Sequence, residues 1–181
     1  QNVSDGEVCR VEDIRQKSTK DRDSNLGMRS GYSALDGYYS FMYDDIISTM
    51  SDWGVSQTGA PFNIFDLDNR TALYTLGGVR YMIREAEAKE NIPWGYELVC
   101  EQDMEVEGKN RTVQLYLHIN TLPLMYAYSG YVLEDEYDQL KPYEKEQAMM
   151  QGIVLEDQSD IGDTDIQPCL LYTSDAADDL T

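Results

Sequence analysis

The chain has 181 residues, and its 34 acidic against 14 basic side chains give a formal net charge of −20. So acidic a surface argues against direct binding to nucleic acid or to an anionic membrane surface, because phosphate contacts need clustered Lys and Arg. A hydrophobic content of 41% with 14 Tyr favours a folded chain with a buried core, and no apolar run reaches the ~18 residues of a membrane-spanning helix. No signal peptide opens the chain, which starts at Gln1, so we expect the natural amino terminus to lie upstream.

Short elements separated by polar or glycine-rich segments are predicted for the first part of the chain. Residues 8–14 alternate roughly and favour a short strand, and residues 17–24 form a charged loop. Residues 27–39 contain three glycines and three tyrosines, a composition typical of irregular, packed backbone. Residues 44–53 predict a helix with one apolar face, ended by Gly54.

A second helix and a strand are predicted directly afterwards. The helix covers residues 69–76, is capped by Asp68 or Asn69, and ends at the glycine pair 77–78. Residues 79–83 then favour a strand. Two connections follow it, a charged helical turn or exposed loop at residues 85–89 and a turn at residues 93–95.

The clearest structural pattern of the sequence lies in residues 112–131. Val113, Leu115, Leu117 and Ile119 alternate with polar or aromatic residues, which predicts a strand whose aliphatic face is buried. Pro123 interrupts the ladder, and the apolar run that surrounds it, residues 122–128, predicts a corner and a second strand. Upstream, residues 96–101 and 104–106 are two candidate strands, and residues 107–110 form a hairpin turn.

The last part of the chain predicts a helical turn, a helix and an acidic exit. Residues 134–140 form the turn, residues 142–152 form a helix with proline in its first turn, and residues 154–155 return to the sheet. The fold class is therefore α+β. We expect an irregular, helix-containing lobe at 1–91, a mostly antiparallel, sandwich-like β lobe with a late helix at 92–156, and a disordered acidic tail at 157–181.

Residues 169–179, CLLYTSDAADD, resemble the translation of a transposon-end sequencing adapter, so we expect residues 169–181 to be non-native sequence. Without them two cysteines remain, Cys9 and Cys100, and their spacing leaves open whether they pair or stay free.

No residue of the sequence is picked out as catalytic, cofactor-binding or metal-binding. The acids are abundant without a pair distinguished by its surroundings, and His118 is the single histidine, so a His-rich metal site is impossible. The acidic segments 66–69 and 157–165 do not match a calcium-binding loop. Some aromatic side chains suit stacking on sugars, although core packing explains them as well, namely Tyr32, Tyr38, Tyr39 and Trp94.

A succession of short motifs resembles the large extracytoplasmic portion of the YfhO family of bacterial membrane proteins. The motifs extend over most of residues 8–156 and comprise Cys-Arg-Val-Glu-Asp at 9–13, Gly-Tyr-Ser at 31–33, Tyr-Ser at 39–40, Asp-Trp-Gly at 52–54, the run 73–83, Tyr116 with the run 122–126, and the segment 136–155. Two positions depart from the family pattern, which tends to have an aromatic residue at position 9 and an asparagine at position 118.

This resemblance implies a fragment of a polytopic protein with a glycosyltransferase-like membrane domain of the GT-C type, acting on cell-envelope polymers such as teichoic acids. It implies a location at the bacterial plasma membrane, with this segment on the extracytoplasmic side. The expected partners are the membrane domain of the same chain and a cell-envelope glycopolymer, with no nucleic acid. The segment would be accessory or acceptor-facing, without a cofactor, and whether the parent protein is a lipid-linked-sugar-dependent glycosyltransferase stays open.

Two other hypotheses come from the residues alone. The tyrosines and alternating strands suit a free-standing extracellular carbohydrate-binding or adhesion module. The many acids suit a small secreted hydrolase, which would need a cleft that holds two facing carboxylates.

Overall fold

The computed structural model describes most of the chain, in the ranges 8–14, 25–38, 42–56, 58–59, 63–64, 66–88, 91–106, 108–162 and 165–169. The predicted loop at 17–24, Tyr39 and residues 170–181 lie outside these ranges. The chain divides into two compact units, Gln1–Ser51 with Val55–Met125, and Asp52–Gly54 with Tyr126–Thr181. The predicted lobe boundary at 91/92 falls inside the first unit.

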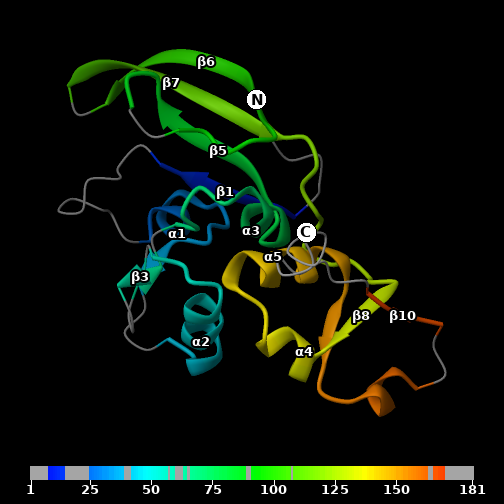
Figure 1. The fold of residues 1–181 in the computed structure, drawn as a ribbon. Helices are drawn as coiled ribbons and strands as arrows, with labels where there is room; N and C mark the ends of the chain where they lie inside the picture. Colours follow the sequence, from blue (N-terminus) through cyan, green and yellow to red (C-terminus); the bar gives the residue numbers. More distant parts are fainter. Residues whose placement is uncertain are drawn as a thin grey trace, which may run out of the picture. The chain divides into compact units, whose positions relative to one another are not determined.

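Unit 1 is built on a four-stranded sheet in the order β1-β5-β7-β6 (Figure 1). Its strands are β1 (Arg10–Asp13), β5 (Val79–Glu85), β6 (Tyr96–Val106) and β7 (Lys109–His118). β1 runs parallel to β5, and the β5–β7 and β6–β7 pairs are antiparallel. The predicted hairpin is confirmed, and the two candidate strands before it form one strand with an irregular register between Leu98 and Cys100.

Short helices and a second, small sheet complete unit 1. The helices are α1 (Leu26–Ser30), α2 (Asp44–Asp52) and α3 (Thr71–Leu76), and the small sheet has the order β2 (Gly37–Tyr38), β4 (Asn63–Ile64), β3 (Thr58–Gly59). The predictions of α2 and α3 are confirmed. α1 and β2 lie in the segment for which irregular backbone was predicted. The sequence did not predict α1 because a five-residue helix has too few turns to show a period.

The predicted cap of α3 is wrong. Its N-cap is Arg70, without a side-chain capping bond, while Asp68 and Asn69 adopt left-handed backbone conformations with φ of 54° and 63°. The Asp68 carboxylate instead accepts hydrogen bonds from the backbone N–H and the hydroxyl of Ser56, at 2.6 and 2.7 Å. Aspartate suits this position because its short polar side chain tolerates left-handed backbone.

The burial along β7 differs from the predicted alternation, since both of its faces are half-buried from Arg111 to Leu117. His118, on the polar and aromatic face, is only 4% exposed, whereas Val113, Leu115 and Leu117 are half-buried and Ile119 is 55% exposed. The neighbouring strand contributes Tyr96 opposite His118. Gln114 and Tyr116 are half-buried like the aliphatic residues, so full burial in β7 is confined to His118, whose ring nitrogens have hydrogen-bond partners.

Unit 2 contains a three-stranded parallel sheet in the order β10-β8-β9. Its strands are β8 (Gly130–Leu133), β9 (Ile153–Leu155) and β10 (Gln167–Pro168), and its helices are α4 (Glu134–Asp138), α5 (Pro142–Gln151) and the 3-10 turn η1 (Gln158–Ile161). The helices α4 and α5 are confirmed, as is the α+β class. Residues 153–155 do form a strand, but the prediction that they return to the antiparallel sheet is wrong, because β9 pairs in parallel with β8 in this separate sheet. The second strand predicted at residues 122–128 does not form, and this segment pairs with none of the described strands.

The small core of unit 2 combines apolar and charged groups. Val132, Tyr137, Leu140 and Ala148 form the buried cluster. Next to it, Lys145 of α5 forms an ion pair with Asp52 and lies 4.9 Å from the centroid of the Tyr137 ring. The Tyr137 hydroxyl accepts a hydrogen bond from the indole N–H of Trp53 at 2.9 Å.

Cys169 is packed within this unit. Its backbone N–H donates to the carbonyl of Tyr131 at 2.8 Å, and its side chain packs against the buried cluster. Burial raises the pKa of its thiol. The predicted acidic tail thus includes η1 and the strand β10, while the adapter-like origin of residues 169–181 stays a prediction.

Candidate functional site

His118 ends β7 and is held by hydrogen bonds on both ring nitrogens. Nδ1 accepts from the backbone N–H of Asn120 at 3.1 Å, so Nε2 carries the proton and donates to the hydroxyl of Thr75 at 3.1 Å. Thr75 in turn donates to the carbonyl of Thr71 at 2.9 Å. The Tyr96 ring packs edge-on against the imidazole at 4.6 Å, and burial lowers the pKa of His118. These contacts hold the imidazole of His118 in place at the end of β7.

The segment after His118 is fixed to the start of β5. The Thr121 hydroxyl lies 3.3 Å from the carbonyl oxygen of His118 and 3.4 Å from that of Val79. The Tyr96 hydroxyl donates to the same Val79 oxygen at 2.7 Å. Further along, Leu124 covers Gly78, whose φ of +67° a glycine adopts readily. The segment from Ile119 to Met125 is therefore held against β5 without pairing as a strand.

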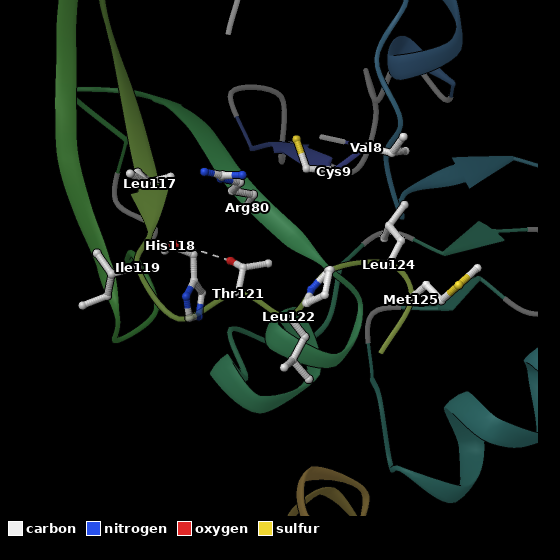
Figure 2. Close-up of a pocket in the computed structure, with 11 residues that line it drawn as sticks. Val8, Cys9, Arg80, Leu117, His118, Ile119, Thr121, Leu122, Leu124 and Met125 are labelled. Carbon is white, nitrogen blue, oxygen red and sulfur yellow. Dashed lines mark hydrogen bonds between the residues drawn. The ribbon is translucent and has the colours of Figure 1, made fainter. Parts of the chain in front are cut away.

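A groove of about 740 Å³ opens beside this segment (Figure 2). Of the eleven described residues that line it, eight are apolar. They come from the start of the described chain, the end of β7 and the segment that follows: Val8, Cys9, Leu117, Ile119, Leu122, Pro123, Leu124 and Met125. The other three are Arg80, His118 and Thr121. Its size is in the range of small-molecule sites, typically 300–1,000 Å³.

Arg80 gives the groove its charge. It is the charged member of the described lining, and Figure 2 shows it between Leu117 and Cys9. Its guanidinium carbon lies 5.8 Å from the centroid of the Tyr81 ring. Sequence reasoning missed this groove, since the described lining residues are brought together by the β1–β5 and β5–β7 pairings between strands far apart in the chain. The one local signal was an arginine within the apolar strand 79–83.

A second, polar pocket of about 370 Å³ lies near the end of β5 and the start of β7. It is lined by Glu85, Glu87, Lys109, Asn110, Arg111 and Thr112. Glu85 forms an ion pair with Arg111 at 2.5 Å, and Glu87 is exposed. Neither carboxylate is buried in an apolar environment of the kind that sets up a general acid, so this pocket does not support the hydrolase hypothesis.

The other residues considered for a site are dispersed. Trp94 is 81% exposed in its turn, Tyr38 is half exposed, and neither lines the groove. Within the described ranges, no group of three or more His, Cys, Asp or Glu side chains is arranged to hold a metal ion.

Cys9 and Cys100 are free thiols. Cys9 precedes β1 and Cys100 lies in β6. These are the two outer strands of the sheet, and three strand spacings place them about 14 Å apart. This separation exceeds the reach of a disulfide.

Comparison with protein families places the chain in a class of bacterial membrane proteins. The matching family is described as Bacterial membrane protein YfhO, its model matches residues 2–174, and the chain belongs to this family. Comparison with curated proteins and with solved structures gave no match. In the part of the chain that the structure describes, no helix has the length and apolar character needed to cross a bilayer.

Proposed function

We propose that this chain is an extracytoplasmic, accessory domain of a polytopic membrane protein that takes part in the glycosylation of cell-envelope polymers of the teichoic-acid type. The observation that carries the proposal is the match to the YfhO family over residues 2–174, which covers most of both units. The catalytic groups of this protein lie in its membrane domain. The chain described here contributes an acceptor-facing surface.

The groove beside β7 supports an accessory role over a catalytic one. Its described lining holds no carboxylate, and its histidine has both ring nitrogens engaged within the protein. A glycosyl transfer needs a group that accepts or donates a proton at the reacting oxygen. The groove can bind and orient a molecule, but it offers no such group.

The side of the membrane is testable with a natural cysteine. Cys100 is exposed on β6, so a membrane-impermeant maleimide should modify it in intact cells that express the complete protein. Mass spectrometry of the peptide that contains Cys100 measures the modified fraction before and after permeabilisation. Equal fractions support the extracytoplasmic location, and modification only after permeabilisation contradicts it. Cys100→Ser is the control for the assignment of the signal.

The role in glycosylation is testable by deletion of the gene. We expect the sugar content of the envelope polymer, measured by NMR on purified material, to fall in the deletion strain and to return on complementation. An unchanged sugar content in the deletion strain would refute the proposal. The purified 181-residue chain should have no transferase activity of its own.

A further inference from the structure

We infer that the outer edge of β6 is a docking site for a basic segment of a partner protein, which adds to the sheet as a further strand with Lys or Arg at alternate positions. The inference concerns a protein partner, and it holds whichever polymer the parent protein acts on.

β6 leaves one edge of the sheet open (Figure 1). The strand has 11 residues and pairs with β7 on one side, and no other described strand pairs with its outer side. All residues from Glu97 to Glu105 are exposed. Many proteins protect such an edge with lysine, proline or a very short strand, and β6 has none of these. Its register is irregular between Leu98 and Cys100 and regular from there to Val106.

The direction of the backbone groups in this regular part follows from a bond on the far side of β7. The carbonyl of Thr112 accepts from the N–H of Ala86, which follows β5, at 2.9 Å. Thr112 thus turns its backbone groups away from β6, so Asp103, which lies opposite it, shares no backbone hydrogen bonds with it. Because bonded and non-bonded pairs alternate, Glu101, Asp103 and Glu105 turn their N–H and C=O groups to the open edge. An added strand can pair with these groups.

The same three residues form a row of carboxylates on one face of the sheet. Their neighbours across β7 are neutral, namely Gln114, Thr112 and Asn110. The Gln114 amide donates to Glu101 at 2.7 Å, and the Thr112 hydroxyl donates to Asp103 at 2.6 Å. These bonds orient two of the carboxylates and leave their negative charge in place, since both donors are uncharged.

The bases of the neighbouring strands do not lie beside this row. Lys109 and Arg111 of β7 belong to the other face of the sheet, where Arg111 pairs with Glu85. Arg84 is on the acidic face, but it lies in β5 with β7 between it and β6, and it donates to Gln114. The edge therefore presents its acids to whatever pairs with it.

The charge of the row selects the occupant. A second copy of this chain, paired along its own β6, would place acids opposite acids, which is unfavourable in a cross-strand pair. A strand with Lys or Arg at alternate positions places bases opposite the three acids. The residues between these bases then share the face of Cys100 and Met104, which suits apolar side chains. A basic, alternating segment is the complementary partner.

The experiment is a calorimetric titration of the 181-residue chain in 50 mM NaCl with the peptide TKVKVKT, acetylated and amidated at its ends. The peptide TEVEVET has the opposite charge, and spermine is a polyamine without peptide groups. We expect TKVKVKT to bind at least tenfold more tightly than either control. Spermine binding as tightly as the peptide would overturn the inference, because the acids would then attract any cation.

Two N-methylated versions of TKVKVKT separate strand addition from charge attraction. One is methylated on the backbone nitrogens of the lysines and the other on those of the valines, so both keep every charge. A strand pairs along one edge with alternate residues only, so one version should lose at least tenfold in affinity and the other should bind like the parent peptide. Loss in the lysine version means antiparallel addition, and loss in the valine version means parallel addition. Loss in both or in neither would contradict strand addition.

Variants localise the binding. The first neutralises the edge and should bind the peptide about tenfold more weakly: Glu101→Gln, Asp103→Asn and Glu105→Gln combined. The control makes the same change in net charge at three exposed acids of α4, which has no open edge, and should bind like the wild type: Glu134→Gln, Asp135→Asn and Glu136→Gln combined. Thermal unfolding of each variant checks that it folds. Equal weakening in both variants would mean that net charge alone attracts the peptide, against the inference.

Discussion

At the scale of single residues, the burial of His118 links the stability of unit 1 to pH. Its folded pKa is lowered by desolvation, while an unfolded histidine titrates near about 6.5. The unfolded chain therefore binds a proton more readily, and the free energy of unfolding falls as the pH decreases through about 6.5 towards the folded pKa. The slope is at most about 1.4 kcal/mol per pH unit, the value for one proton.

Urea unfolding between pH 7.5 and 5.5 measures this effect. His118 is the single histidine of the sequence, so a side-chain titration in this window is assigned to it. In His118→Asn, the side-chain oxygen can replace Nδ1 as the acceptor for Asn120, but it does not reach Thr75. We expect this variant to be less stable at pH 7.5 by about 1 kcal/mol and to lose the pH dependence. An equally steep dependence in the variant would contradict the assignment.

Gly152 is required for close packing in unit 2, not for its backbone conformation. Its φ of −156° is extended, yet a Cβ atom there would lie 2.7 Å from the carbonyl oxygen of Gly130 and 2.6 Å from Sγ of Cys169. Gly152→Ala should therefore lower the free energy of unfolding by about 2 kcal/mol. The contact with backbone atoms makes this cost hard to relieve.

Two comparisons test the origin of that cost. Gly108 has a φ of +73° and open space around it, so Gly108→Ala measures backbone strain alone and should cost about 1 kcal/mol. Combining Gly152→Ala with Cys169→Ala should be less damaging than the sum of the two changes, because the thiol contact is gone. If the losses in unfolding free energy of the two single variants add exactly in the double variant, steric contact with Cys169 is not the origin of the cost of Gly152→Ala.

At the scale of elements, Lys145 connects α5 to Asp52 within unit 2. This lysine is almost fully buried, pairs with the half-exposed Asp52 and lies over the Tyr137 ring. Lys145→Ala removes the ion pair, the cation–π contact and the packing of the aliphatic stem. We expect it to lower the free energy of unfolding of unit 2 by about 2 kcal/mol.

Trp53 offers a local signal for this measurement, since its indole bonds to the Tyr137 hydroxyl. In a Trp94→Phe background the fluorescence reports Trp53 alone, because the chain has two tryptophans. Lys145→Met keeps the stem and should recover part of the loss. Gln147→Ala, at an exposed position of the same helix, should change the stability by less than about 0.5 kcal/mol. A loss as large in Gln147→Ala as in Lys145→Ala would sink the interpretation.

Most regular elements could be predicted from the sequence, because their patterns are local. The strand alternation before His118, the Pro142 start of α5 and the Gly77 end of α3 each follow from a few neighbouring residues. The buried face of β7 could not, because His118 is buried through partners far along the chain, Thr75 and Tyr96. The alternation alone predicted that the aliphatic face would be the buried one.

The groove was hidden for a related reason. Arg80 lies in β5 and Ile119 follows β7, and only the antiparallel pairing of these strands brings them together. The apolar run around Pro123 looked like a strand, but strand formation needs a neighbour with a matching register. In its place Leu124 covers Gly78, and that contact depends on the missing side chain of this glycine, because a Cβ there would lie 2.5 Å from Cδ2 of Leu124.

At the scale of the whole molecule, the excess of acids sets the response to salt. With 34 acidic and 14 basic side chains, folding brings like charges closer together than they are in the unfolded chain. Raising NaCl from 10 to 300 mM shortens the screening length from about 30 Å to less than 8 Å. We expect the free energy of unfolding to rise by about 1 kcal/mol over this range.

A charge-reversed variant separates this effect from specific ion pairs. Glu97 and Glu105 are exposed on the outer strand β6, and Glu97→Lys with Glu105→Lys changes the net charge from −20 to −16, since each reversal adds two units. Because repulsion grows with net charge, urea unfolding of this variant should show a smaller gain from NaCl than the wild type. A decrease in wild-type stability with added NaCl would instead mean that screened ion pairs, such as Glu85 with Arg111, outweigh the repulsion among the acids.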